Sequence, residues 1–572
     1  MTALKLKLIC VTLLILFNQN GFTQNLESIG QSKPIEVSGG LSLSNIIYAA
    51  DGIDQRRDPY TYFASGNVTL SLYGWSVPFS FAFSNQNSSF QQPFNQYGLH
   101  PTYKWITGHI GYTSMSFSPY TLNGHLFLGA GVDLEPTDKL SISAMYGRLQ
   151  KAIQPDSTNE SVLPAFYRTG FGLKTSYGSA SDNVTFIFFS ATDDENSLNY
   201  VPESLEVLPR ENLVLSLGGS KTIVPNLILK AEIATSALTR DKRAASYESS
   251  SKNIFSTGIF NQKQSTGYYN AYNVGISYAF SAFSVGAGYE RIDPGYETLG
   301  AYFFNNNLEN ITANANTSLF SGKVNVGVNA GLQRDNLDGE KVSSMSRFVG
   351  SMNVGYTPSN RLNIAVNYSS FNTYTNIRSQ FQDINQLTPY DNLDTLNFTQ
   401  ISQSINSNVN YMLSTNEARR QNINVNITYQ NAADEQGGVE QNSGSQFYMF
   451  NAAYNLSIVP SNTSFTLAFN YSKNEAAGLN STTLGPTLGV NKTLLDKKMR
   501  TGLSVSLNNA YTNNQLVNRV VNYRLTGSYA LKKKHAFNVS AVALNRTTVG
   551  EDGAVDFLEF TGTVGYNLTL GY

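Results

Sequence analysis

Residues 324–333, Val-Asn-Val-Gly-Val-Asn-Ala-Gly-Leu-Gln, alternate apolar residues with polar residues or glycine without a break. The same alternation recurs at 423–430 and at 465–472. Successive side chains of a β-strand point to opposite faces, so this pattern predicts strands with one apolar and one polar face. The polar face is asparagine, serine, threonine and glycine, and it therefore requires contact with water. Strands of about ten residues with an apolar outside and a hydrated inside predict a transmembrane β-barrel.

The N-terminus has the features of a secretory signal peptide over residues 1–24. Lys5 and Lys7 precede an apolar stretch, Leu8–Phe17, that is too short to span a bilayer as a helix. We expect cleavage after Gln24, then a short periplasmic segment at 25–34 and the barrel over 35–572. The single cysteine of the chain lies inside the apolar stretch, so the mature protein is expected to contain no disulfide.

Composition narrows the functional classes. The chain has 39 basic and 40 acidic residues. Loss of the two signal-peptide lysines leaves 37 against 40, a formal charge of −3, which gives no indication of nucleic-acid binding. No apolar run is long enough for a transmembrane helix, yet 12% of the residues are aromatic. Barrels account for both observations, because only alternate residues face lipid and aromatic residues gather at the membrane interfaces.

Breaks between the expected strands alternate between two kinds. Short breaks contain proline, glycine, asparagine or lysine, as in Pro136-Thr137-Asp138, Pro460-Ser461-Asn462 and Lys532-Lys533-Lys534. Long polar breaks fall near 151–164, 194–210, 241–266, 293–308, 374–394 and 432–444. Outer-membrane barrels have short periplasmic turns and long extracellular loops. We therefore predict a single antiparallel barrel of about 24 strands with both termini in the periplasm. The alternation at Ser114–Ser118 leaves open a further strand pair within 88–123, and hence 26 strands.

The C-terminus places alternate apolar residues on one face and ends on an aromatic residue: Tyr566, Leu568, Leu570 and Tyr572. In this respect the chain resembles the outer-membrane β-barrel superfamily of Gram-negative bacteria. The resemblance implies an integral outer-membrane protein in contact with outer-membrane lipid, whose last strand is recognised by the barrel-assembly machinery. The asparagine-rich strands and the Gln24 site are similar to those of Bacteroidota proteins. No motif places the chain in one functional family.

No set of residues predicts catalysis, a cofactor or a metal site. The chain has four histidines, and serines are too abundant for any serine–histidine pairing to be specific. Asp193-Asp194-Glu195 has calcium-type ligands but no defined loop spacing, so a solvated loop is the simpler interpretation. We therefore expect a protein that is not an enzyme.

The segment 88–123 is the longest break and the preferred functional candidate. We expect it to fold inward and narrow the lumen, with a second strand pair as the alternative. Its candidate constriction or ligand residues are Tyr103, Lys104, Trp105, His109 and Tyr112. Arg56 and Arg57 are a second candidate, either as a clamp for an anionic ligand or lipopolysaccharide or as local partners of Asp54 and Asp58.

Three functions fit these expectations. The first is a porin-like channel for polar solutes, with little ion selectivity because the inward face contains few charges. The second is a structural or translocation subunit of a multiprotein outer-membrane complex, with a stoichiometric outer-membrane or periplasmic partner. The third is a surface-binding receptor or adhesin that uses the long loops.

Overall fold

The protein is seen in a computed structural model, which describes residues 35–85, 95–155, 163–201, 207–246, 260–339, 346–370, 401–432, 435–436, 439–440, 445–476, 478–532, 534–549 and 556–571. The described residues form strands, turns and irregular segments without an α-helix. Among them, no helix has the length and apolar character needed to cross a membrane. The signal peptide expected at 1–24 and the segment 25–34 lie outside the described residues.

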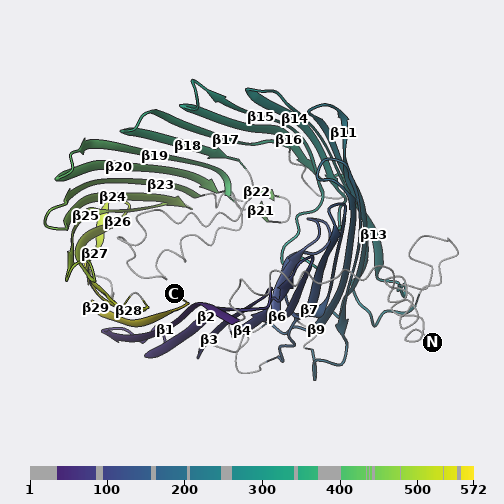
Figure 1. The fold of residues 1–572 in the computed structure, drawn as a ribbon, viewed down its shortest axis with the longest axis horizontal. Coiled ribbons are helices and arrows are strands. Elements are labelled where there is room, and N and C mark those ends of the chain that lie inside the picture. The colour runs from purple at the N-terminus through teal and green to yellow at the C-terminus, as the bar shows by residue number, and fades with distance from the viewer. Residues whose placement is uncertain are drawn as a thin grey trace.

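One antiparallel sheet closes on itself (Figure 1). Its strands are β1 (Ile35–Asp51), β2 (Tyr60–Leu72), β3 (Trp75–Ser84), β4 (Gln96–Leu99), β5 (Thr102–Tyr103), β6 (Ile106–Ser116), β7 (Asn123–Thr137), β8 (Leu140–Gln150), β9 (Tyr167–Gly178), β10 (Asn183–Asp194), β11 (Glu211–Val224), β12 (Leu227–Thr239), β13 (Thr266–Ala279) and β14 (Phe283–Ile292). It continues with β15 (Leu308–Leu319), β16 (Val324–Asp335), β17 (Ser346–Ser359), β18 (Leu362–Ser369), β19 (Ile401–Thr415), β20 (Arg419–Ala432), β23 (Ser445–Ile458), β24 (Thr463–Ala476), β25 (Leu479–Leu494), β26 (Met499–Thr512), β27 (Gln515–Leu531), β28 (His535–Thr548) and β29 (Phe557–Leu570). A separate two-stranded ladder joins β21 (Glu435–Gln436) to β22 (Val439–Glu440).

Closure comes from β1 and β29, which pair from Gly39 opposite Leu570 to Asp51 opposite Leu558. Both strands also pair with their chain neighbours, β2 and β28. A sheet closed in this way has no free edge, so every strand has two hydrogen-bonded partners. The expected single antiparallel barrel is confirmed.

The strand number is 26 rather than 24. The sheet contains 27 strands, but the short β4 and β5 share one position, because both pair with β3 on one side and with β6 on the other. The additional pair lies at 96–116, inside the segment expected to be a constriction loop. That expectation is wrong for most of the segment, since its alternating residues satisfy their backbone hydrogen bonds within the wall. The alternative of a hidden strand pair is confirmed.

Connections differ at the two ends of the barrel. The end that holds the start of β1 and the end of β29 has short turns, such as 73–74, 138–139 and 225–226. The opposite end holds the longer connections, among them 52–59, 117–122 and 293–307. Two-residue turns also occur there, and Asn513 and Asn514 make one with φ values of 49° and 68°. This left-handed geometry fits a tight hairpin and is tolerated by asparagine.

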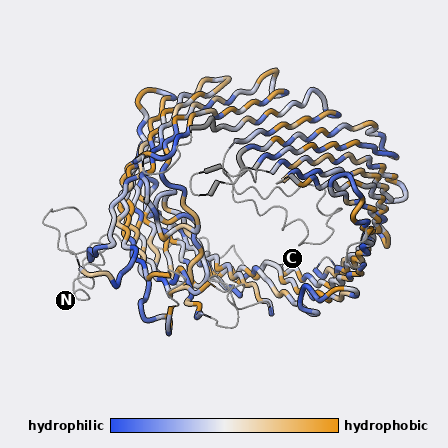
Figure 2. Tube along the Cα trace, turned by 180° about the vertical axis from the view of Figure 1, so that it is seen from behind, coloured by the Kyte–Doolittle hydropathy of each residue, from blue (hydrophilic) through white to orange (hydrophobic). Residues whose placement is uncertain are grey.

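Apolar side chains cover the outside of the wall. Figure 2 shows the alternation of hydrophobic and hydrophilic residues along the strands. The outward positions include strongly exposed residues such as Leu217 (58% exposed), Ile311 (58%), Leu332 (62%) and Leu488 (61%). A band of exposed aliphatic side chains around a closed sheet is stable in lipid, where the backbone polar groups are already paired within the sheet.

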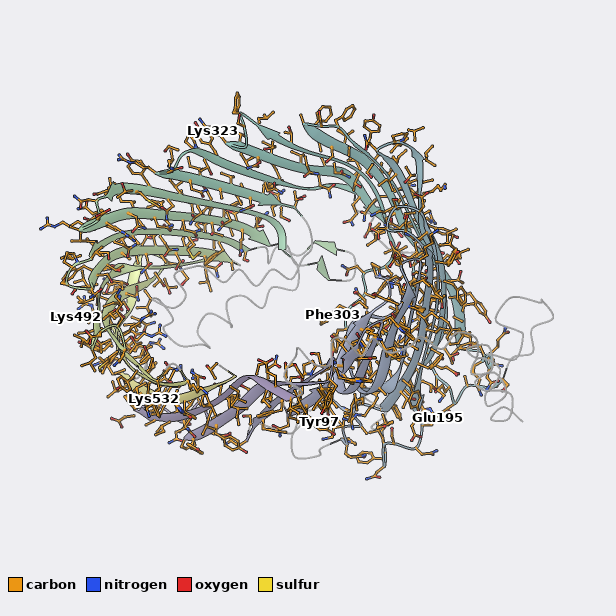
Figure 3. The ribbon with its side chains drawn as sticks, viewed as in Figure 1. Tyr97, Glu195, Phe303, Lys323, Lys492 and Lys532 are labelled. Carbon is orange, nitrogen blue, oxygen red and sulfur yellow. The ribbon has the colours of Figure 1, made fainter. Side chains whose placement is uncertain are left out.

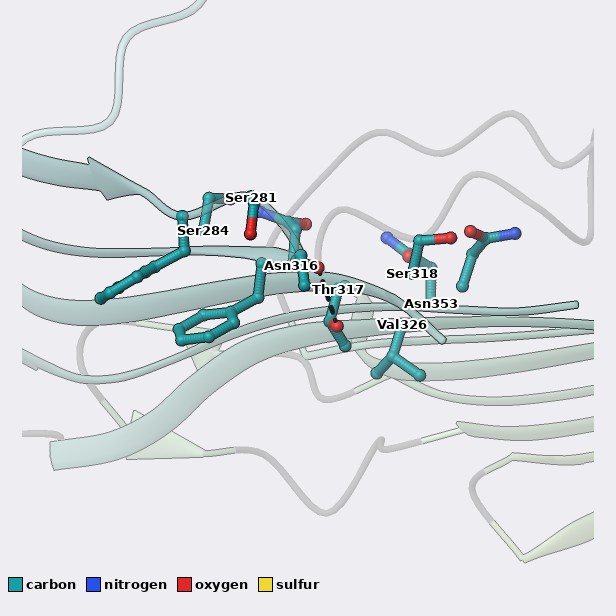
Figure 4. Close-up of a pocket in the computed structure, with 12 residues that line it drawn as sticks. Ser281, Ser284, Asn316, Thr317, Ser318, Val326 and Asn353 are labelled. Carbon is teal, nitrogen blue, oxygen red and sulfur yellow. Dashed lines mark hydrogen bonds between the residues drawn. The ribbon is translucent and has the colours of Figure 1, made fainter. Parts of the chain in front are cut away.

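Asparagine amides cover much of the opposite face between β15 and β24. Asn316 and Asn353 flank Gly327 in the β15–β16–β17 ladder. A Cβ atom at Gly327 would lie 2.6 Å from the Asn353 Oδ1 and 2.8 Å from the Asn316 Oδ1, so glycine leaves room for the two amides. Figure 4 shows Asn316 and Asn353 in the pocket formed near the β13–β14 turn. Neutral amides of this kind make a hydrated wall without a strong electric field.

Candidate functional site

The interior of the barrel has two unlike sides. Along β6–β14 the inward face carries a cluster of buried apolar side chains among polar ones. Two chain segments pack on this cluster: residues 117–122, which connect β6 to β7, and residues 293–307, which connect β14 to β15. The resulting apolar cluster joins both segments to the wall and includes Leu122, Phe127, Phe189, Tyr296 and Leu299. Figure 3 places Phe303, at the end of the second segment, on the inner side of the wall. We call residues 117–122 and 293–307 the inner segments.

Two hydrogen bonds join the inner segments to each other, and a third joins the second segment to Asn123, which directly follows the first. The Tyr296 hydroxyl donates to the Tyr120 carbonyl oxygen at 2.8 Å, and the Thr298 hydroxyl donates to the Thr121 carbonyl oxygen at 2.7 Å. The Asn123 N–H donates to the Gly300 carbonyl oxygen at 2.9 Å. The Tyr296 and Thr298 side chains are buried, so their two bonds are shielded from competing water. The two segments therefore form one unit.

Polar side chains of the wall hold this unit in place. The Tyr120 hydroxyl donates to the Glu290 carboxylate at 2.5 Å, and the Leu299 N–H donates to the Asn212 Oδ1 at 3.1 Å. Lys174 donates from its Nζ to the Phe117 carbonyl oxygen at 2.9 Å. These bonds satisfy backbone groups that would otherwise be buried without a partner.

Gly300 is a point of close approach between the inner segments and the wall. A Cβ atom at this position would lie 2.7 Å from the Thr121 carbonyl oxygen and 2.7 Å from the ring of Phe189. A larger residue would therefore separate the two segments or displace the ring.

The two tyrosines that join the inner segments remain protonated. Burial, together with the nearby Glu290 carboxylate, raises the pKa of Tyr120 far above its usual value. Burial likewise raises the pKa of Tyr296. Both hydroxyls thus stay hydrogen-bond donors at any physiological pH.

Three of the residues proposed for a constriction lie away from the interior. Tyr103 stacks on Trp75 with 4.8 Å between ring centroids, and both belong to outward positions at the short-turn end. Lys104 sits in the β5–β6 turn with its Nζ 5.2 Å from the Tyr103 ring centre, and Trp105 is 40% exposed. Aromatic and basic residues at this level suit a membrane interface.

His109 and Tyr112 lie on opposite faces of β6. Tyr112 packs edge-on against Tyr97 and accepts a hydrogen bond from Arg148 on the outward side. His109 faces inward, where its Nε2 is 2.8 Å from the Asp133 carboxylate and its Nδ1 is 3.0 Å from the Nδ1 of His100. Of the five candidates in 88–123, only His109 therefore faces the interior, in a chain of hydrogen bonds with wall residues.

Arg56 and Arg57 lie in the connection between β1 and β2, near the seam of the barrel. Arg56 is 3.8 Å from the Glu559 carboxylate and its guanidinium lies 4.9 Å from the Phe557 ring centre. Arg57 lies 5.4 Å from the ring centre of Tyr48. Both arginines thus contact inward residues of β1 and β29. Their use in binding an external anion stays a prediction.

The residues of the predicted assembly signal occupy the outward face of β29. Tyr566 contacts His535, with 2.7 Å between its hydroxyl and the histidine Nδ1, and it packs against Phe537. Leu568 and Leu570 follow Tyr566 at every second position of β29, so they face outward as well. Tyr572 lies outside the described residues, and recognition by an assembly machinery stays a prediction.

Sequence reasoning placed 117–122 within the segment 88–123 that was expected to fold inward, but it did not identify 293–307 as part of a site. Residues 293–308 were expected to be a polar loop, although they contain Tyr296, Leu299 and Tyr302–Phe304. This apolar content is the signal that distinguishes an inward segment from a solvated one, because exposed loops rarely carry so many large apolar residues.

Comparisons with known proteins find only distant likeness. No protein-family model and no curated sequence matches the chain. Among solved structures, the P pilus usher translocation pore is 10% identical, with a TM-score of 0.34, covering 94% of this chain and 100% of the usher chain. The siderophore receptor PirA from Pseudomonas aeruginosa is 10% identical, with a TM-score of 0.39, covering 93% of this chain and 80% of the receptor. OccK3 from Pseudomonas aeruginosa is 10% identical, with a TM-score of 0.27, covering 96% of this chain and 100% of OccK3. Likeness at this level carries no conclusion about function.

The architecture itself defines the class of protein. A closed 26-strand sheet, an apolar outer band and an interior lined by amides and hydroxyls are the features of a large transmembrane β-barrel.

Proposed function

We propose that this protein is an outer-membrane channel that passes polar solutes through its lumen, with the inner segments narrowing the passage. The observation that carries the proposal is the division of the interior. One side is filled by 117–122 and 293–307, whereas the side formed by β15–β24 presents asparagine, serine and threonine. Polar groups on an inner wall favour hydrated solutes, and a packed segment limits their size.

A role as a structural or translocation subunit, or as a surface receptor, leads to different expectations. A subunit requires a stoichiometric partner and need not conduct by itself. Extraction in mild detergent with an affinity tag separates these cases, because a partner in equal amount would indicate a subunit. Recovery of the barrel alone or as a self-oligomer would favour the channel.

The decisive experiment is solute flux through proteoliposomes. We expect swelling rates that fall steeply as neutral sugars increase in size from a pentose to a trisaccharide, as expected for a water-filled passage of limited width. Liposomes with heat-denatured protein provide the control. Swelling no faster than in the control for every sugar would contradict the channel function.

A further inference from the structure

Inward-facing charged side chains gather on β25–β29, next to the asparagine-rich strands. In β25–β29 the inward positions include three arginines, Arg500, Arg524 and Arg546, and the carboxylate of Glu559. Glu559 already accepts a hydrogen bond from Tyr48 at 2.5 Å and lies 3.8 Å from Arg56. The Glu559 carboxylate therefore interacts with Tyr48 and Arg56 rather than with the arginines deeper in the lumen.

Arg500 and Arg524 line one cavity of about 550 Å³ in the short-turn half of the inner wall. The cavity has no aspartate or glutamate in its lining, which otherwise consists mainly of hydroxyl and amide side chains, among them Ser528, Asn538, Thr563 and Asn567. Its volume falls within the range of small-molecule sites. Arginine guanidinium groups with neighbouring hydroxyl and amide donors are the usual recognition set for carboxylate and phosphate oxygens.

One donor in this cavity has no partner. The Arg524 Nε is inaccessible to solvent and makes no hydrogen bond within the part of the chain that the structure describes. Buried donors are nearly always paired in folded proteins, and a charged one most of all. The Arg524 side chain as a whole is only half-buried, and it lines the cavity.

We propose that this cavity binds the anionic oxygen groups, carboxylate or phosphate, of solutes that pass through the lumen. The inference rests on the proposed channel function, and it adds a substrate class: small anionic solutes. Arg524 provides one positive charge in the cavity lining, Arg500 adds a second at the short-turn end, and the neutral donors contact the remaining oxygens. An anion entering from the other rim would pass Arg546 before reaching this cavity.

Planar-bilayer recording under a KCl gradient tests the inference. We expect the wild-type reversal potential to show a preference for chloride, and inorganic phosphate or succinate to block the chloride current. The double variant Arg500→Gln, Arg524→Gln should lose the preference and raise the half-blocking concentration at least about tenfold. Arg519→Gln is the matched control, because Arg519 lies on the same strand, β27, but on the outward face with Asn509 as its partner. Heat-modifiable gel mobility of each variant checks that the barrel has folded.

A binding titration of the detergent-solubilised protein with inorganic phosphate, and separately with succinate, tests the site without conductance. Binding that is lost in the double variant and kept in Arg519→Gln supports the site even if no current is seen, in which case only the channel function fails. Two outcomes would overturn the inference and leave the channel function standing. One is equal block of the current in all three proteins, and the other is binding of phosphate and succinate that the double variant retains.

Discussion

Tyr296 joins the two inner segments at the scale of a single residue. Its side chain is fully buried, its hydroxyl donates to the Tyr120 carbonyl oxygen, and its ring packs against Phe304 at 5.0 Å between centroids. Removal of a buried aromatic side chain costs about 3 kcal/mol or more, whereas loss of one neutral hydrogen bond costs about 1 kcal/mol.

We therefore expect Tyr296→Ala to release both inner segments and Tyr296→Phe to loosen them only slightly. Hydrogen exchange followed by mass spectrometry measures this, because the Asn123 N–H donates to the Gly300 carbonyl oxygen and the Leu299 N–H donates to Asn212 of the wall. Peptides covering 117–123 and 293–307 should exchange about 100-fold faster in Tyr296→Ala. Peptides from β23 and β24 serve as the internal control. Unchanged exchange in 117–123 would show that the two segments are held independently.

At the scale of elements, the connection between β6 and β7 is longer than the hairpin requires. Ser116 pairs with Asn123, so two residues would suffice to join the strands, yet six are present and they are packed inside. A two-residue turn at Asn513-Asn514 shows that this rim accepts tight hairpins. The additional four residues therefore serve the interior rather than the wall.

Replacement of residues 117–122 by Asn-Gly should widen the passage. Loss of Phe117, Tyr120 and Leu122 removes half of the unit, and the segment 293–307 loses its two hydrogen bonds to Tyr120 and Thr121. We expect faster swelling of proteoliposomes with the largest sugars and a larger unit conductance. Asn514→Gly, a change in a tight turn at the same rim, is the control and should leave both unchanged. Equal flux in the two variants would argue that the inner segments do not narrow the path.

The strands could be predicted from the sequence where the alternation of apolar and polar residues is clear within a few consecutive positions. The alternation at 324–333 became β16 with its apolar residues outward, because period-two patterning and backbone pairing operate within a few residues. The segment 88–123 was harder, since β4 and β5 have four and two residues and carry little alternation of their own. The inner segments and the arginine cavity depend on which strands become neighbours, and only the closed sheet brings Arg500 and Arg524 to one cavity.

At the scale of the whole molecule, stability depends on closure. The β1–β29 ladder joins the two ends of the sheet, and loss of either strand would expose two edges with unpaired N–H and C=O groups in lipid. Each such group costs several kcal/mol in the bilayer core, so an open sheet is not a stable alternative.

A chain that ends at residue 556 should therefore fail to form the barrel, because it lacks all of β29. The intact protein, extracted in detergent, is expected to migrate faster on a gel before boiling than after it, since a closed barrel stays compact and resists the detergent. The truncated chain should show one slow band under both conditions. Tyr566→Phe, which keeps the ring against Phe537 and removes only the hydroxyl near His535, should keep the shift. A fast unboiled band from the truncated chain would mean that the barrel can close without β29.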